Sequence, residues 1–98
     1  MTFDQFKRLV SDGKETAELS PLLRALLCDA RGDWDSGHRI AQDIEGSSAA
    51  WVHAYLHRKE GDLGNAFYWY KRAGRTECRS SLEEEWETIA RHLLQEEI

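Results

Sequence analysis

The residues best suited to chemistry in this chain are histidines. His53 and His57 are four positions apart, so both rings lie on one face if the segment is a helix. Two imidazoles in this arrangement form part of many zinc sites, which need at least one further ligand. The residues that could supply it are His38, Cys28, Asp29 and Asp33. The alternative is that both rings are core histidines, hydrogen-bonded to their neighbours, and no His-Glu-x-x-His motif accompanies them.

A second group of residues combines aromatic rings with cations. Trp51, Tyr55, Arg58 and Lys59 follow the i, i+4, i+7, i+8 spacing of one helix face. Such a face suits an acidic or aromatic partner peptide, through cation–π contacts and hydrogen bonds. The alternative is that Trp51 and Tyr55 pack against a terminal helix of this small protein.

Four aromatic residues in a row, at positions 67 to 70, point all round a helix and cannot all face one core. We expect Phe67 and Tyr70 inside, and Tyr68 or Trp69 partly exposed or covered by the last helix. If uncovered, these rings mark a partner or dimer surface. The cations that follow are Lys71, Arg72, Arg75 and Arg79. A phosphate or RNA contact is one interpretation of them, but the adjacent glutamates at 83 to 85 favour a solvated, self-neutralising surface.

Composition limits the classes of function. The chain has 98 residues, 41% hydrophobic and 32% charged, which favours one acidic globular domain. A net charge of −5 argues against a nucleic-acid partner, which needs a basic face. No apolar run approaches the ~20 residues of a membrane span, and the first residues do not resemble a secretion signal. We therefore expect a cytoplasmic protein with Cys28 and Cys78 reduced. The chain has no local motif for a catalytic nucleophile and no glycine-rich phosphate loop. We therefore expect neither an enzyme nor a cofactor.

The elements that must position these residues are helices, since β-branched residues are scarce and alternating apolar patterns are absent. The pattern predicts helices at residues 2–10, 21–30, 33–44, 49–59 and 62–72, and a last helix after Ser81, with residues 14–19 as a connector. Ser81 and Glu84 form a capping box, while Ser47 or Ser48 is the expected cap of the helix at 49–59.

A degenerate repeat organises these helices. The pair Gly32-Asp33 recurs as Gly61-Asp62, a step of 29 residues (61 − 32), with helical segments on both sides. Repeats of roughly 20–50 residues are typical of stacked supersecondary units, each unable to bury its apolar face alone.

The second unit resembles a tetratricopeptide repeat, because Ala66 and Tyr70 match its Ala-x-x-x-aromatic element and Ala73 the small residue one turn later. The stretch from Ala66 to Gly74 also resembles Sel-one-like repeats. The resemblance covers about residues 21–74 and is weaker in the first unit. The chain departs from the tetratricopeptide pattern in its short repeat step of 29 residues and in its histidines at 53 and 57. Trp51 is also displaced by one position from the usual tryptophan, and no proline closes either unit.

The resemblance implies an all-α fold: a short right-handed stack of antiparallel helix pairs, with capping N- and C-terminal helices. The expected parts are an N-terminal cap at 1–19, helix pairs at 20–45 and 47–74, and a C-terminal helix at 81–98. It also implies a non-catalytic module that binds a protein or peptide, or a second copy of itself as a homodimer. The expected contact residues are Trp51, Tyr55, Arg58, Lys59, Tyr68 and Trp69. The alternative is a metal- or small-molecule-binding protein, or an enzyme, centred on His38, His53 and His57.

Overall fold

The computed structural model describes residues 1–12 and 18–96. Within these residues the protein has six α-helices and no strand, which confirms the predicted all-α class. None of these helices has both the length and the apolar character needed to cross a membrane. The predicted connector at 14–19 falls mostly on residues 13–17, outside the described residues. The helices are α1 (Phe3–Asp12), α2 (Pro21–Ala30), α3 (Trp34–Gln42), α4 (Ser47–Glu60), α5 (Leu63–Arg72) and α6 (Leu82–Glu96).

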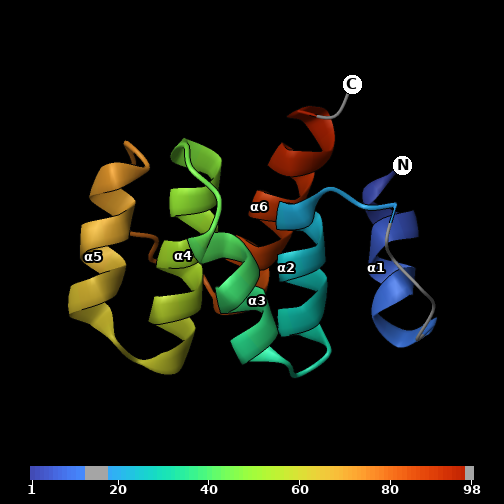
Figure 1. Ribbon diagram of the computed structural model, residues 1–98, viewed down its shortest axis with the longest axis horizontal. Helices are drawn as coiled ribbons and strands as arrows, with labels where there is room; N and C mark the ends of the chain where they lie inside the picture. Colours follow the sequence, from blue (N-terminus) through green and yellow to red (C-terminus); the bar gives the residue numbers. More distant parts are fainter. Residues whose placement is uncertain (13–17, 97–98) are drawn as a thin grey trace.

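The helices form a row along the longest dimension of the molecule (Figure 1). Helix α5 lies at one end beside α4, the pair α2 and α3 lies in the middle, and α1 lies at the other end. The most extensive contacts join α4 to α5 and α2 to α3, the partners of the two helix hairpins. Helix α6 contacts α1, α2 and α4, so it covers one side of the row.

Two matching turns form these hairpins. Gly32 and Gly61 both adopt the left-handed conformation, with φ of 89° and 90°, which glycine reaches without a steric penalty. The aspartate after each glycine caps the next helix. The Asp33 carboxylate accepts a hydrogen bond from the backbone N–H of Ser36 (3.2 Å), and the Asp62 carboxylate accepts one from Asn65 (3.4 Å).

Helix α4 is the centre of the core. Nine consecutive residues, from Ala49 to His57, are buried, so this helix is enclosed on all sides. It contacts α2, α3, α5 and α6. Trp51, His53, Tyr55 and His57 therefore lie at the centre of the fold, while Arg58 is half-buried and Lys59 is exposed.

Three local predictions were wrong. Gly46, with φ of 113°, occupies the cap position of α4, and no serine side chain caps that helix. Helix α3 ends at Gln42 rather than near Ile44. Phe67 was expected inside, yet it is 47% exposed, because α5 packs on α4 through Ala66, Tyr70 and Ala73 and leaves Phe67 on the outer side. The serine half of the capping box predicted for α6 is present, since the Ser81 hydroxyl accepts a hydrogen bond from the Glu84 N–H (3.1 Å). The Glu84 carboxylate accepts from the Ser81 hydroxyl (3.0 Å) instead of from the Ser81 backbone N–H.

Candidate functional site

The aromatic and basic stripe on α4 faces other helices of the protein. Trp51 and Tyr55 are buried, so neither ring is accessible to a partner in this conformation. The guanidinium of Arg75 lies 3.4 Å from the centroid of the Trp51 ring and covers it. Helix α6 contacts α4 and carries Trp86, Ile89 and Leu93 into the core.

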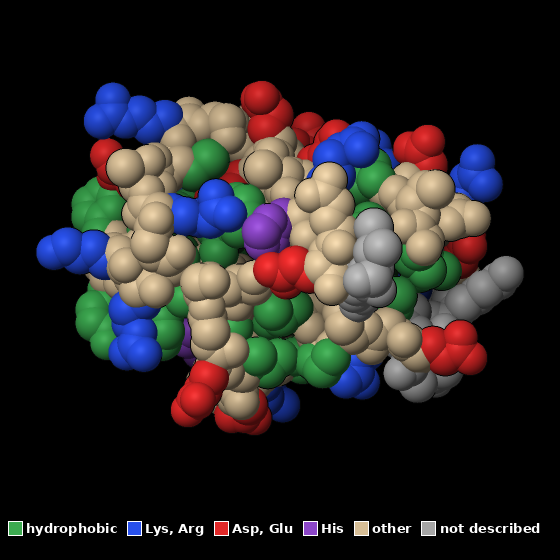
Figure 2. Space-filling view, turned by 90° about the horizontal axis from the view of Figure 1, so that it is seen from above, with side chains coloured by type: hydrophobic (Ala, Val, Ile, Leu, Met, Phe, Trp, Pro, Cys, Tyr) green, Lys and Arg blue, Asp and Glu red, His purple; other side chains and the backbone are tan. Residues whose placement is uncertain are grey.

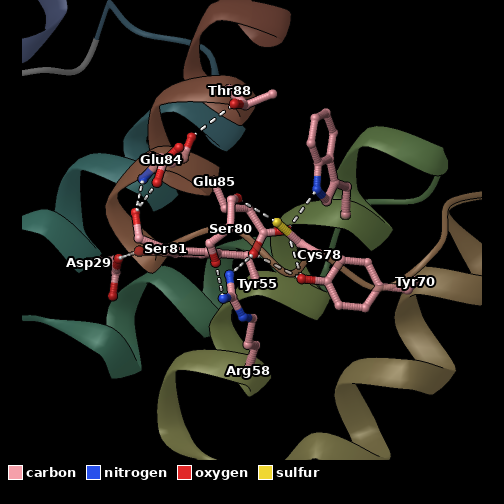
Figure 3. Close-up of polar contacts among 11 residues, drawn as sticks. Asp29, Tyr55, Arg58, Tyr70, Cys78, Ser80, Ser81, Glu84, Glu85 and Thr88 are labelled. Carbon is pink, nitrogen blue, oxygen red and sulfur yellow. Dashed lines mark hydrogen bonds and ion pairs between the residues drawn. The ribbon is translucent and has the colours of Figure 1, made fainter.

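A buried carboxylate of α6 uses several donors of this stripe. Glu85, 1% exposed, accepts hydrogen bonds from the Tyr70 hydroxyl (2.6 Å) and the Trp51 indole N–H (3.2 Å). Arg58 forms an ion pair with it at 2.8 Å and also donates to the Ser80 carbonyl (Figure 3). Burial, and then the hydrogen bond to Glu85, raises the pKa of the Tyr70 hydroxyl. The predicted contact residue Arg58 therefore holds α6 against α4.

A second buried carboxylate uses the other end of the stripe. Asp29 on α2 accepts from the Tyr55 hydroxyl (3.0 Å) and forms an ion pair with the Lys59 ammonium (3.0 Å). Beside it lies a cleft of about 680 Å³ between α1, α2, α4 and α6, lined in part by Phe3, Trp86 and Lys7. The polar groups of Tyr55, Asp29 and Lys59 are already bonded to one another, so they hold the helices together across the floor of this cleft.

The outer face of α5 is exposed and mixes apolar with basic side chains. Leu63, Phe67 and Tyr68 are 53%, 47% and 51% exposed. Arg72 donates a hydrogen bond to the Tyr68 hydroxyl (3.0 Å), and its guanidinium lies 5.2 Å from the Trp69 ring centroid. In Figure 2, basic and hydrophobic side chains adjoin at the end of the molecule where α5 lies. We call Leu63, Phe67, Tyr68 and Arg72 the α5 outer face; of the predicted contact residues, Tyr68 belongs to it.

The structure brings the three candidate histidines together between α3 and α4. The Nε2 atoms of His38 and His53 are 2.9 Å apart, and the His53 and His57 rings stack with centroids 4.8 Å apart. The His38 ring meets both edge-on, at 4.7 and 5.1 Å. One nitrogen from each ring falls within 4.8 Å of the others, and we call these three residues the histidine cluster.

Tryptophans enclose the histidine cluster on two sides. Trp34 stacks on His38, with centroids 4.9 Å apart, and Trp69 stacks on His53 at 3.9 Å. The predicted contact residue Trp69 is thus half-buried against a histidine. Burial, followed by the nearby His38 and His57, lowers the pKa of His53 to about 4, so its ring is neutral at physiological pH. Burial, followed by His57, also lowers the pKa of His38.

Sequence analysis missed the roles of Glu85 and Trp34. Glu85 lies four residues before Ile89, on the apolar stripe of α6, and an acidic residue at such a position is a signal of a buried ion pair. Trp34 lies four residues before His38, a spacing that brings the two rings together on a helix. Neither signal identifies the partner across the core.

The chain matches no protein-family model, and comparisons with curated proteins and with solved structures also find no match.

Proposed function

We propose that the protein is a non-catalytic interaction module that binds a partner segment through the α5 outer face. The observation that carries this proposal is the exposure of Leu63, Phe67 and Tyr68 at one end of the helix row. In a stack of helix pairs, the end helix meets solvent and normally presents a polar outer face. Three half-exposed large side chains within six residues depart from that rule and favour coverage by another molecule.

The chemistry of this face favours an acidic or aromatic segment. Lys71 and Arg72 end α5 and are exposed beside the rings. Arg72 already lies over Tyr68, with its guanidinium 5.8 Å from the ring centroid, so a partner carboxylate would meet a cation held in place. Aromatic rings and arginine are the residues most often found at the centre of protein interfaces.

We also propose that the two hairpins stack as in a minimal tetratricopeptide-like unit. The repeated turn supports this, since Gly32 and Gly61 have nearly the same φ and each is followed by an aspartate cap. The contacts of α4 with α2 and α3 support it further, because they place one hairpin against the other.

The environment of Cys28 bears on whether this thiol acts as a nucleophile. Burial, and then the Asp33 carboxylate, raises the pKa of the Cys28 thiol above its usual value. The thiolate is the reactive form of cysteine, so this environment disfavours nucleophilic chemistry.

Site-specific photo-crosslinking in living cells tests the interaction. A benzophenone amino acid replaces Phe67 or Tyr68 in turn, and Thr88, an exposed residue of α6, serves as the matched control. We expect crosslinked adducts from positions 67 and 68 and none from position 88. An adduct of twice the chain mass identifies a second copy of the protein, and any other mass identifies a different partner.

Sedimentation velocity over a range of concentrations gives an independent measurement of self-association. If the partner is a second copy, Phe67→Glu shifts the protein toward monomer, because it places a charge in the apolar contact. Equal crosslinking from positions 67, 68 and 88 would rule the proposal out.

A further inference from the structure

We propose that His38, His53 and His57 form a binding site for a divalent transition-metal ion of the zinc type. This inference goes beyond the interaction role and does not depend on it. It rests on three imidazoles from two helices, whose packing brings one nitrogen of each ring within 4.8 Å of the others. Imidazole nitrogen is a favoured ligand of zinc, copper and nickel, and three histidines are a known zinc ligand set.

The separations of the ring nitrogens are close to those of a zinc site. Zinc–nitrogen bonds of about 2.0–2.1 Å in tetrahedral geometry place ligand nitrogens about 3.3 Å apart. The Nε2 atoms of His38 and His53 are 2.9 Å apart, and one nitrogen of each of the three rings lies within 4.8 Å of the others. To complete the site, side-chain rotation would have to move the nitrogens by a fraction of an ångström to about 1.5 Å. It would also have to turn the stacked His53 and His57 rings so that one nitrogen of each points at the ion.

The His57 ring is already oriented by a carboxylate, that of Glu60. The Nδ1 of His57 lies 2.7 Å from Oε2 of Glu60, one turn later on α4. With Nδ1 used in this hydrogen bond, Nε2 is the nitrogen left to bind a metal. Metal-ligating histidines commonly donate a hydrogen bond from their second ring N–H to a carboxylate in this way. The hydrogen bond fixes the orientation of the ring and raises the basicity of the ligating nitrogen. Glu60 is thus a positioning residue of the proposed site.

Two tryptophans border the cluster. Trp34 stacks on His38 and Trp69 stacks on His53. The Trp34 indole N–H donates to the carbonyl of Leu56 (2.8 Å), which fixes that ring in turn. His53 and His57 are buried, while His38 is half-buried, so a metal ion can enter on the His38 side and keep one water ligand there.

The rings already contact one another without a metal ion. Only a neutral imidazole offers a lone pair to a metal, so binding requires the three rings to be neutral. In the protein without metal, one hydrogen bond between His38 and His53 uses part of the capacity of these rings. A metal ion would replace it with three bonds to nitrogen.

A second set of donors, His57, Glu60 and Asp62, also lies close together, but its carboxylates have other roles. Asp62 accepts hydrogen bonds from the backbone N–H and the side-chain amide of Asn65, and so caps α5. This set excludes His38, so a His38 variant distinguishes the two.

The test is a zinc titration by calorimetry of the full chain, purified without a histidine tag, together with the absorption spectrum of the Co²⁺ form. We expect one ion per chain and a tetrahedral Co²⁺ spectrum without a sulfur-to-metal band, since neither cysteine belongs to the site. The variants are His38→Ala, at the half-buried ligand, and the matched control His92→Ala, at the remaining histidine of the chain, which pairs with Glu96 on α6. Circular dichroism of each variant in chelator confirms that it is folded.

We expect His38→Ala to weaken zinc binding by at least about tenfold and His92→Ala to leave it unchanged. Glu60→Gln should weaken binding by about 10–100-fold, with the unfolding free energy in chelator nearly unchanged, because it acts on the orientation of His57. Absence of stoichiometric zinc binding, an unchanged affinity in His38→Ala, or a loss in His92→Ala would each overturn the proposal.

Discussion

At the scale of single residues, the two buried carboxylates Asp29 and Glu85 explain why the aromatic and basic stripe of α4 faces inward. Each lies on a helix packed against α4. Asp29 accepts hydrogen bonds from Tyr55 and Lys59 of α4. Glu85 accepts them from Arg58 of α4 and Tyr70 of α5. A buried charge is costly unless it is paired and hydrogen-bonded. Here the stripe supplies every donor named above except the Tyr70 hydroxyl, which comes from α5. The carboxylates therefore hold α2 and α6 against the stripe on α4.

Removing the Glu85 carboxylate tests this interpretation. We expect Glu85→Ala to lower the free energy of unfolding by about 3–5 kcal/mol, because Arg58 is left as an unpaired charge and Tyr70 loses its acceptor. The matched control is Glu87→Ala on the same helix, whose ion pair with Arg91 is exposed and is worth less than about 1 kcal/mol. Urea denaturation measures both, and equal losses in the two variants would contradict the role of Glu85.

The tyrosines that contact these carboxylates should resist ionisation. Burial, and then the nearby Asp29, raises the pKa of Tyr55, and burial followed by the hydrogen bond to Glu85 raises that of Tyr70. Because the folded pKa lies above the unfolded value of about 10, this contribution to stability is present below pH 10 and is lost as the pH rises above it.

We therefore expect the phenolate absorbance of Tyr55 and Tyr70 to appear only with unfolding. Alkaline titration with and without urea, followed alongside circular dichroism, measures this. Ionisation of all three tyrosines near pH 10 in the folded protein would contradict it.

At the scale of elements, the first hairpin depends on a close approach of its two helices. Gly37 of α3 lies against α2, and a Cβ added at this position would come within 2.8 Å of the Ala25 carbonyl oxygen. This contact is with backbone, which cannot change rotamer to make room. The short distance between α2 and α3 holds His38, the next residue, over His53 on α4.

Substitution of glycines tests the close approach. We expect Gly37→Ala to destabilise the protein by about 1–3 kcal/mol, in spite of the higher helix propensity of alanine. Gly64→Ala is the matched control, since a Cβ there meets nothing within 4 Å, and should stabilise by about 0.5–1 kcal/mol. Thermal unfolding measures both, and a Gly37→Ala protein as stable as the parent would rule out the close packing.

At the scale of the whole molecule, α6 connects the N-terminal helix to the two hairpins. Its Trp86 stacks on Phe6, with ring centroids 5.6 Å apart, and meets Phe3 edge-on at 6.0 Å. The Trp86 indole N–H donates to the carbonyl of Leu26 on α2 (3.0 Å). One hydrophobic cluster therefore includes residues of all six described helices, and no group of helices has a core of its own.

A shared core predicts a single cooperative unfolding transition. We expect the urea curves from far-ultraviolet circular dichroism, which reports all helices, and from tryptophan fluorescence to coincide. Phe6→Ala should shift both curves together by about 3–5 kcal/mol, because it removes a fully buried ring. An early transition seen by circular dichroism alone in that variant would show that α1 unfolds separately.

The sequence by itself determined the elements and their order. Local signals that act over a few residues suffice for these. They are Ser20 and Pro21 at the start of α2, Gly32 and Gly61 at the hairpin turns, and the Ser81 cap before α6. The spacing of His53 and His57 also fixed their common face.

Only the tertiary structure decided what each face meets. The period of a helix shows which residues share a face, but it does not identify the neighbour, which depends on packing between residues far apart in the chain. The stripe with Trp51 and Tyr55 is covered because α6 brings Glu85 to it, 34 residues after Trp51. Phe67 is exposed because α5 is the outermost of the described helices at that end of the row. His38 reaches His53, 15 residues away, because α3 packs against α4.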